Sequence, residues 1–446
     1  MPTVKDADSE GRPAFIAVVI FTFILLLSPQ NWIPALAPFR IAFLAAGAAA
    51  VLLLWERWHR IGPRRTPRRE VILAMALATW ALLTVPLSYW PGGSLNLLSD
   101  LYLKALAIFW LLANVVTTAH RLRLVAMSLL LCTIPLAGTA LKNFMTGKFH
   151  GGVAPAERII GYQSGLSSNP NDLALMLNLV IPLGVALFLS NKKAIVRIFC
   201  LLVIAFAIVG VILTFSRGGF LGLATTGTVY FTKLIRRPGS DRNWAFALLL
   251  VGMLLLPLLP SNYLGRIATM TDIETDPTGS AQERWGDNVV AMRFIIAHPI
   301  VGAGLGMDVL ALNEERGPRW LRIHNVYLEY AVDLGLPGLV LFLLVLYGAF
   351  STVRAARRRA ASEPALRDLF LVNEGLEVSL IVFAIVGFFH PAAYNFYFYY
   401  IAGLALASRL ATDSALSVTN TSGDAASESY MPHIAYGRRF MTSELP

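Results

Sequence analysis

A single histidine stands behind two arginines at the start of a long apolar run. His324 follows Arg319 and Arg322, and the apolar segment after it continues to about residue 349. An imidazole ordinarily titrates at about pH 6.5, which suits a general base at neutral pH, and nearby cations favour its neutral form. His324 is therefore the candidate base, and Asn325 can orient its ring or bind a sugar hydroxyl. A purely structural, hydrogen-bonding histidine is the alternative.

Arginines stand at other points where an anion could bind. Arg217, in TFSRGGFLGL, ends one apolar run, and the glycines Gly218 and Gly219 let another backbone or a phosphate approach closely. Arg284, in QERW, is the second candidate, and Arg266 is its rival. Guanidinium groups hold phosphate through paired hydrogen bonds and keep their charge. Arg217 could also be an interfacial anchor, and Arg284 a solvated helix residue. The further substrate-binding candidates of this type are Arg319 and Arg322.

The stretch SSNPNDLALML, residues 167–177, is typical of a helix start. Asn169 or Ser168 can cap the helix, Pro170 fits its first turn, and Asp172 favours its dipole. The N–H groups at such an end also attract anions. Asn169 and Asn171 are therefore candidate substrate-binding residues, although capping alone explains the pattern.

The sequence predicts neither a metal nor another cofactor. The spaced acids Asp272, Glu274, Asp276, Glu283 and Asp287 could form a divalent-ion site, but acids near arginines are usually solvated ion pairs. Cys132 and Cys200 both fall in apolar runs and indicate packing. The glycines of VGAGLGM follow a helix pattern and not a strand, which favours a tightly turned loop against the membrane over a dinucleotide site.

These residues must be positioned by membrane-spanning helices. The chain is 56% hydrophobic and 14% charged, against about 25% charged residues in soluble domains. Apolar runs of spanning length indicate an all-α polytopic membrane protein with about twelve transmembrane helices. The runs lie near 14–30, 34–55, 71–90, 101–118, 124–145, 171–190, 198–215, 219–234, 244–260, 326–350, 372–390 and 394–411. The first resembles a signal peptide, but Pro38 follows the apparent cleavage site, which favours an uncleaved anchor.

The basic residues predict the orientation of these helices. More than half of the 37 Lys and Arg residues fall in connections on one side of a twelve-span chain, and such residues favour the cytoplasm. We therefore expect both termini in the cytoplasm and the 261–325 loop in the periplasm. Residues 1–411 form one transmembrane domain, and 412–446 are expected to be a disordered cytoplasmic tail. The net charge of +10 reflects this topology and not nucleic-acid binding. The basic residues in question are Arg57, Arg60, Arg64, Arg65, Arg68, Arg69, Arg121, Arg123, Lys192, Lys193, Arg197, Lys233, Arg236, Arg237, Arg242, Arg354, Arg357, Arg358, Arg359 and Arg367.

Four segments together resemble the O-antigen ligase and O-antigen polymerase superfamily. They are TFSRGGFLGL, SNPNDLA, ERWGDNVVAMRFIIAHPIVGAGLGM and HNVYLEYAVDLGLPGLVLF, and the resemblance covers about residues 160–345. It implies a metal-independent, inverting glycosyltransferase that uses a polyprenyl-diphosphate-linked glycan. On this resemblance Arg217, Arg284 and His324 match the arginine before the glycine pair, the arginine of the outer loop and the histidine before asparagine.

The resemblance implies an O-antigen ligase in the bacterial inner membrane. Such an enzyme moves glycan from an undecaprenyl-diphosphate carrier to lipid A–core at the periplasmic face. A repeat-unit polymerase is the alternative within the superfamily. A lipid-linked oligosaccharide flippase or another transporter is the alternative from a different class, and it predicts charged residues along a central cavity.

Overall fold

The computed structural model describes residues 12–59, 68–150, 158–159, 161–162, 169–255 and 280–429. Within these ranges the protein is α-helical, apart from short 3-10 and π segments and one antiparallel pair of two-residue strands, β1 (Phe149–His150) and β2 (Arg158–Ile159). The prediction of an all-α polytopic membrane protein is confirmed. The helices are α2 (Arg12–Leu27), α3 (Ile41–His59), α4 (Arg69–Thr84), α5 (Pro91–Leu97), α6 (Leu103–Val115), α7 (Ala119–Met145), α8 (Pro170–Ser190), α9 (Ala194–Leu213), α10 (Arg217–Ile235), α11 (Ser240–Leu255), α13 (Ser280–Ala297), α14 (Asp308–Arg316), α15 (Val326–Ala361), α16 (Arg367–Val386) and α17 (Phe396–Ser429).

Each of the twelve expected spans overlaps one of these helices, and the last part of the span near 244–260 lies outside the described residues. Among the described residues, eight helical segments are long and apolar enough to cross a membrane, and α2 is a shorter apolar helix. The count of twelve stays a prediction. The eight segments are Ile41–His59, Arg69–Leu87, Pro91–Val115, Ala119–Met145, Pro170–Ser190, Ala194–Leu213, Val326–Ala361 and Pro364–Phe389.

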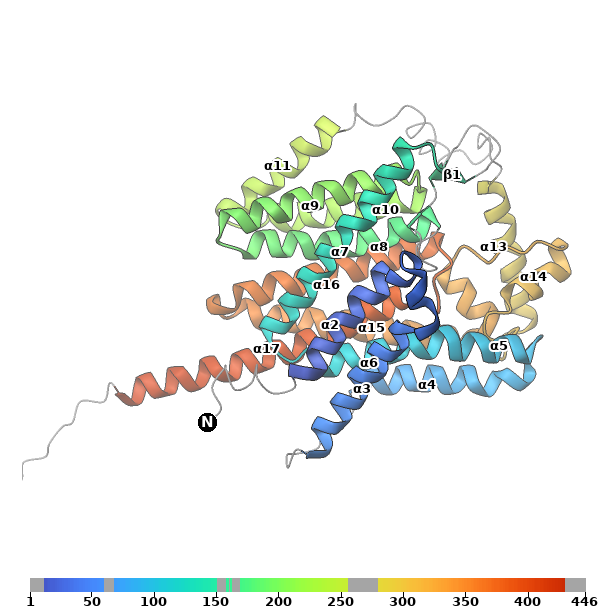
Figure 1. Cartoon of the computed structure of the whole chain (residues 1–446), viewed down its shortest axis with the longest axis horizontal. Helices are drawn as coiled ribbons and strands as arrows, with labels where there is room; N and C mark the ends of the chain where they lie inside the picture. Colours follow the sequence, from blue (N-terminus) through green and yellow to red (C-terminus); the bar gives the residue numbers. More distant parts are fainter. Residues whose placement is uncertain are drawn as a thin grey trace, which may run out of the picture.

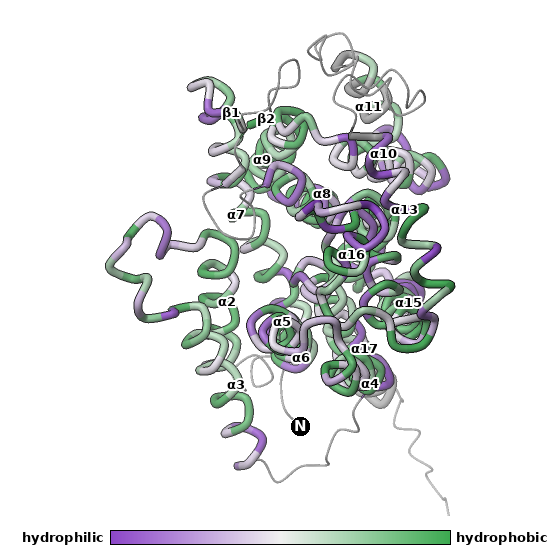
Figure 2. The backbone as a smooth tube through the Cα atoms, turned by 90° about the vertical axis from the view of Figure 1, so that its right-hand side faces the viewer, coloured by the Kyte–Doolittle hydropathy of each residue, from purple (hydrophilic) through white to green (hydrophobic). Residues whose placement is uncertain are grey.

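The long helices run side by side, while α13 and α14 lie at one end of the bundle (Figure 1). The helices α8 and α16 form its centre, because 83% and 78% of their apolar windows are buried in protein. By contrast, only 11% of the window in α3 is buried, and α3 lies at the edge of the bundle in the end-on view of Figure 2. Such an apolar, unburied helix is suited to contact with lipid.

The helix α15 is broken at Gly335, which has a φ of 69° and lies two residues before Pro337. The break frees the carbonyl groups of Val332, Asp333 and Leu334 from helical hydrogen bonds. Ala303 and Gly304 donate their backbone N–H groups to the first two, each at 2.8 Å, and the Trp80 indole donates to the third.

The donors Ala303 and Gly304 belong to the glycine turn 302–306. Gly302, Gly304 and Gly306 all have positive φ angles, and a Cβ at Gly302 would lie 2.4 Å from the Val332 carbonyl oxygen. The turn therefore needs glycine both for its conformation and for its close approach to α15. The prediction of a tight turn here is confirmed.

The expected disorder of residues 412–446 is wrong for its first part. The helix α17 continues through these residues to Ser429, and Thr412 is fully buried. Extending an existing helix requires no new nucleation, so Ala- and Ser-rich residues can continue one that packing has already formed. Residues 430–446 lie outside the described part of the chain.

Candidate active site

Three helices begin around one corner of the chain, and each start has a side-chain cap. Asn169 accepts a hydrogen bond from the Asn171 N–H at the start of α8, and Ser216 accepts one from the Gly219 N–H at the start of α10. At the start of α15, Asn325 accepts hydrogen bonds from the N–H groups of Tyr327 and Leu328. The predicted cap at Asn169 is confirmed.

The corner itself is the 3-10 turn η8 (Gly387–Phe389) with the following His390. A Cβ at Gly218 would lie 3.9 Å from Phe389, so the start of α10 lies against the turn. A Cβ at Gly387 would lie 3.7 Å from Val326, the first residue of α15. The corner therefore contacts both the helix that begins with Arg217 and the helix that follows His324.

The corner is joined to α8 by an ion pair or hydrogen bond that the sequence did not predict. His390 Nε2 lies 2.7 Å from Asp172 Oδ1, and the histidine is buried. Sequence reasoning used Asp172 only as a favourable charge at a helix start. His390 falls in a short turn between two apolar runs, and nothing in its local pattern marks it.

The glycines after Arg217 serve helix packing. A Cβ at Gly219 would lie 2.9 Å from that of Ala174 on α8, and one at Gly222 would lie 2.8 Å from the Asn178 side chain. Asn178 also donates to the Gly219 carbonyl oxygen at 3.0 Å. The sequence suggested that another backbone or a phosphate approaches the glycines after Arg217. At Gly219 and Gly222 the structure shows the neighbouring helix α8 in that place.

Arg217 is the first residue of α10 and is partly buried. Phe215, two residues earlier, has a φ of 51°, which turns the chain sharply between α9 and α10. This turn, the Ser216 cap and the glycine packing together fix the backbone that carries the guanidinium.

His324 is partly buried, and its neighbours in the chain are fixed on both sides. The Ile323 N–H donates to Asp308 Oδ2 at 2.9 Å, and Asn325 caps α15. Asn325 therefore caps α15, while its contacts with the His324 ring and with a substrate stay predictions.

Arg322 lies against a buried acidic cluster formed by Asp308, Glu329 and Asp333, all fully buried. Its guanidinium is 3.4 Å from Glu329 Oε1. Burial alone would lower the pKa of Arg322, but the charges of Glu329, Asp308 and Asp333 outweigh it and raise the pKa. Burial raises the pKa of Asp308, and Arg322 partly opposes this. Arg322 therefore serves as the counter-charge of these acids.

Each carboxylate of the acidic cluster also holds a different loop. Asp308 accepts the N–H of Ile323, Asp333 accepts that of Gly306 at 2.8 Å, and Glu329 accepts that of Ala393 at 3.2 Å. Acids within an apolar run are a recognised sign of a functional or structural site, and Glu329 and Asp333 could have been found that way.

Two of the remaining predicted residues, Arg284 and Arg319, lie on or near α13. Arg284 is partly buried on that helix, which packs against α14 and α15. Arg319 lies 3.7 Å from Glu283, and both are about half exposed. Arg266 falls outside the described residues, as do the acids Asp272, Glu274 and Asp276.

A buried ion pair joins α13 to α14. Arg316 lies 2.7 Å from Asp287, and their side chains are 5% and 9% exposed. Arg316 also donates to the Leu321 carbonyl oxygen at 2.5 Å, in the loop that leads to His324. Two of the acids that were considered as a metal site therefore lie beside arginines. Glu283 lies beside Arg319, and Asp287 lies beside Arg316.

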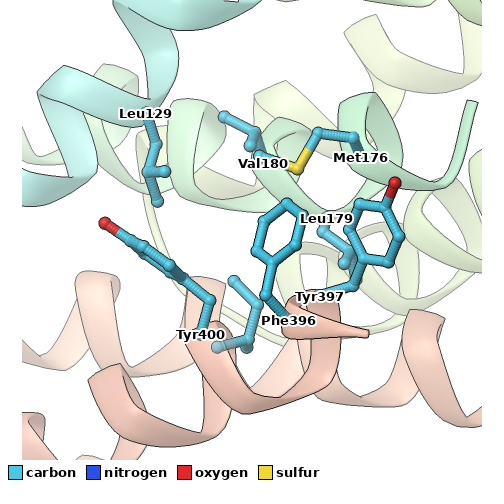
Figure 3. A pocket seen from close by; sticks show the side chains of 8 residues that line it. Leu129, Met176, Leu179, Val180, Phe396, Tyr397 and Tyr400 are labelled. Atoms are coloured by element: carbon cyan, nitrogen blue, oxygen red, sulfur yellow. The ribbon is translucent and has the colours of Figure 1, made fainter. Parts of the chain in front are cut away.

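A small crevice lies between α7, α8 and α17 (Figure 3). Its lining is aliphatic and aromatic, and it includes Met176, one turn after Asp172, and Tyr397 of α17. The candidate residues Arg217 and His324 are not part of it. The crevice therefore does not contain the proposed base or the proposed phosphate ligand Arg217.

Comparison with known proteins places part of the chain in a family. Residues 201–343 match the family model described as O-antigen ligase. The matched range contains Arg217, Arg284 and His324. A search of curated proteins finds no match. The match over these residues supports membership of the O-antigen ligase superfamily.

Proposed function

We propose that the protein is an O-antigen ligase. It would move glycan from an undecaprenyl-diphosphate carrier to lipid A–core, as an inverting glycosyltransferase that needs no metal. The family supports glycosyltransferase activity of the ligase or polymerase type. The observation that carries the proposal furthest is the corner 387–390, which contacts both the helix that Arg217 begins and the helix that follows His324.

The corner is suited to a diphosphate. The starts of α8, α10 and α15 lie around it, and each helix start carries a partial positive charge of about half a unit. Arg217 adds a full charge and can hold two phosphate oxygens at once. Arg284, from α13, is the proposed second phosphate ligand, and Asn169, Asn171, Arg319 and Arg322 are the remaining proposed binding residues.

The proposed reaction is a single displacement. His324 takes the proton of the acceptor hydroxyl while that oxygen attacks the anomeric carbon of the donor sugar. The bond from this carbon to the diphosphate oxygen breaks, and its electron pair leaves with the polyprenyl diphosphate. Arg217 and Arg284 stabilise the charge that develops there. Attack from the face opposite the leaving group inverts the anomeric centre.

The glycolipid profile of a deletion strain tests this function. A ligase predicts loss of all lipid A-linked O-antigen together with accumulation of polymer on the lipid carrier. A polymerase predicts instead that single repeat units stay attached to lipid A–core. Loss of lipid A-linked O-antigen without accumulation of polymer, with single lipid-linked units trapped on the cytoplasmic side, would point to a flippase.

The proposed orientation places the corner in the periplasm of the bacterial inner membrane, with both termini in the cytoplasm. It is supported by the basic residues near the opposite helix ends. A membrane-impermeant thiol reagent applied to cells should modify Gln282→Cys and spare Ser362→Cys, since both positions are exposed in the protein. The reverse labelling pattern would invert the scheme.

A further inference from the structure

One face of α13 carries exposed apolar side chains at helical spacing. Trp285, Val289, Met292 and Ile296 follow one another at intervals of four, three and four residues, which places them on one side of a helix. Their exposed fractions run from 38% to 76%. The opposite side, with Ala291, Phe294 and Ile295, is buried against α14 and α15.

This exposed stripe continues into the outer surface of α15. The Pro299 carbonyl oxygen, just beyond α13, accepts a hydrogen bond of 2.8 Å from the Leu336 N–H. From Leu336 onwards α15 has its own stripe of exposed apolar side chains. Ile300, which follows Pro299 in the chain, is 63% exposed. The members of the stripe on α15 are Leu336, Val340, Leu343 and Tyr347.

The stripe on α15 belongs to a helix long and apolar enough to cross a membrane. Its exposed apolar residues are therefore the side chains that contact lipid in a membrane-spanning helix. Because the stripe on α13 joins this surface at the Pro299–Leu336 bond, the same lipid can cover both.

The direction of α13 agrees with contact between its exposed stripe and lipid. In Figure 1 the helix runs across the end of the bundle, and not along the spanning helices. A helix in this position, with an apolar face, a tryptophan and a basic residue such as the exposed Arg293, has the features of an interfacial membrane helix. We propose that the outward face of α13 rests in the membrane interface, in contact with lipid.

The position of α13 at the membrane interface also sets the depth of Arg284, and the role of Arg284 rests on the proposed function. Arg284 lies three residues before the buried Asp287 and seven before Ala291, on the inward side of α13. A helix held at the interface keeps Arg284 at the depth of lipid head groups. That is the depth at which the diphosphate of a membrane-anchored donor lies.

Spin labelling in lipid nanodiscs tests the placement on the full-length protein. A nitroxide is attached to Met292→Cys or Ile296→Cys in a background with Cys132→Ala and Cys200→Ala, both of which are buried positions. Collision rates are measured with oxygen, which concentrates in lipid, and with a water-soluble nickel chelate. Val340→Cys serves as the lipid-facing control, and the exposed Glu315→Cys on α14 serves as the water-facing control.

The expected result is that both α13 labels match Val340→Cys, with frequent oxygen collisions and rare nickel collisions. Labels that match Glu315→Cys would overturn the proposal, because the stripe would then face water. Rare collisions with both reagents would also overturn it, since a second copy of the chain would then cover the stripe. No glycan transfer enters the measurement, so failure here is distinct from failure of the proposed function.

Discussion

His390 Nε2 and Asp172 Oδ1 lie 2.7 Å apart although the two residues are 218 positions apart in the chain. The contact joins the corner 387–390 to the start of α8. The same corner lies against Gly218, next to Arg217, and against Val326, two residues after His324. The Asp172–His390 pair is therefore placed to fix the spacing between the proposed phosphate ligand and the proposed base.

Breaking this pair should destabilise the protein and lower transfer. Asp172→Ala or His390→Ala should each lower the unfolding free energy by about 1–3 kcal/mol, because the remaining side chain of the pair loses its hydrogen-bond partner. The double variant should cost less than the sum of the two. Thermal unfolding in detergent measures this, and strictly additive losses would show that the two side chains do not interact.

Arg217→Lys should lose most of the transfer activity while the protein still folds. Lysine keeps the positive charge but cannot form the paired hydrogen bonds of a guanidinium with phosphate. The assay compares initial rates at equal amounts of folded protein. A lysine variant as active as the parent would make Arg217 an interfacial anchor and not a ligand of the diphosphate.

His324→Ala should reduce the transfer rate by about 10²–10⁴-fold, the usual contribution of a general base. Donor-lipid binding should be largely retained, because the phosphate contacts belong to the arginines. In the parent enzyme the rate should fall as the pH drops below the pKa of the base, since only the neutral imidazole accepts a proton.

A histidine with only a structural role would give a different pattern. The alanine variant would then be poorly expressed, or it would transfer glycan almost normally. Yield, donor binding and rate must therefore be measured together. A well-folded variant with the parent's rate would falsify the role of His324 as base.

Two glycines of α10 form a matched pair for testing helix packing. Gly219→Ala should destabilise the protein, because its Cβ would lie 2.9 Å from that of Ala174, closer than such atoms pack. Gly227→Ala meets nothing within 4 Å and should stabilise α10 by about 0.5–1 kcal/mol. Unfolding temperatures that shift alike for both variants would contradict the close contact between α8 and α10.

Asp308→Asn should change how stability depends on pH. Burial raises the pKa of Asp308 above its ordinary value of 3.8, so on acidification the folded state binds this proton before the unfolded state does. Stability from this group is thus fully present below pH 3.8 and is lost as the pH rises towards the folded pKa. Asparagine does not ionise, so the stability of the variant relative to that of the parent should increase as the pH rises over that range.

The comparison requires unfolding temperatures of both proteins from about pH 4 to pH 8. The charge of Asp308 also acts on the neighbouring Glu329 and Asp333, so the difference between the two proteins reports the coupled titration of this acidic cluster. A difference in unfolding temperature that is the same at every pH in this range would contradict a raised pKa of Asp308 in the folded protein.

The sequence by itself determined the helical class, the positions of the apolar runs and the start of a helix near Asn169. These depend on local composition and on spacings of three to four residues, which are visible in one stretch of chain. The glycine turn at 302–306 was also predictable, because three alternating glycines permit conformations that other residues avoid. The tail was mispredicted because its composition does not show that a packed helix leads into it.

Only the tertiary structure decided which residues meet at the site. The pair of Asp172 and His390, the ion pair of Arg316 with Asp287, and the acidic cluster around Arg322 each join segments that lie on different elements. Arg322 stays a proposed substrate ligand, but only the fold shows that its guanidinium lies against Glu329. Charge is a local property of a sequence, but the partner of a charge depends on how the helices pack.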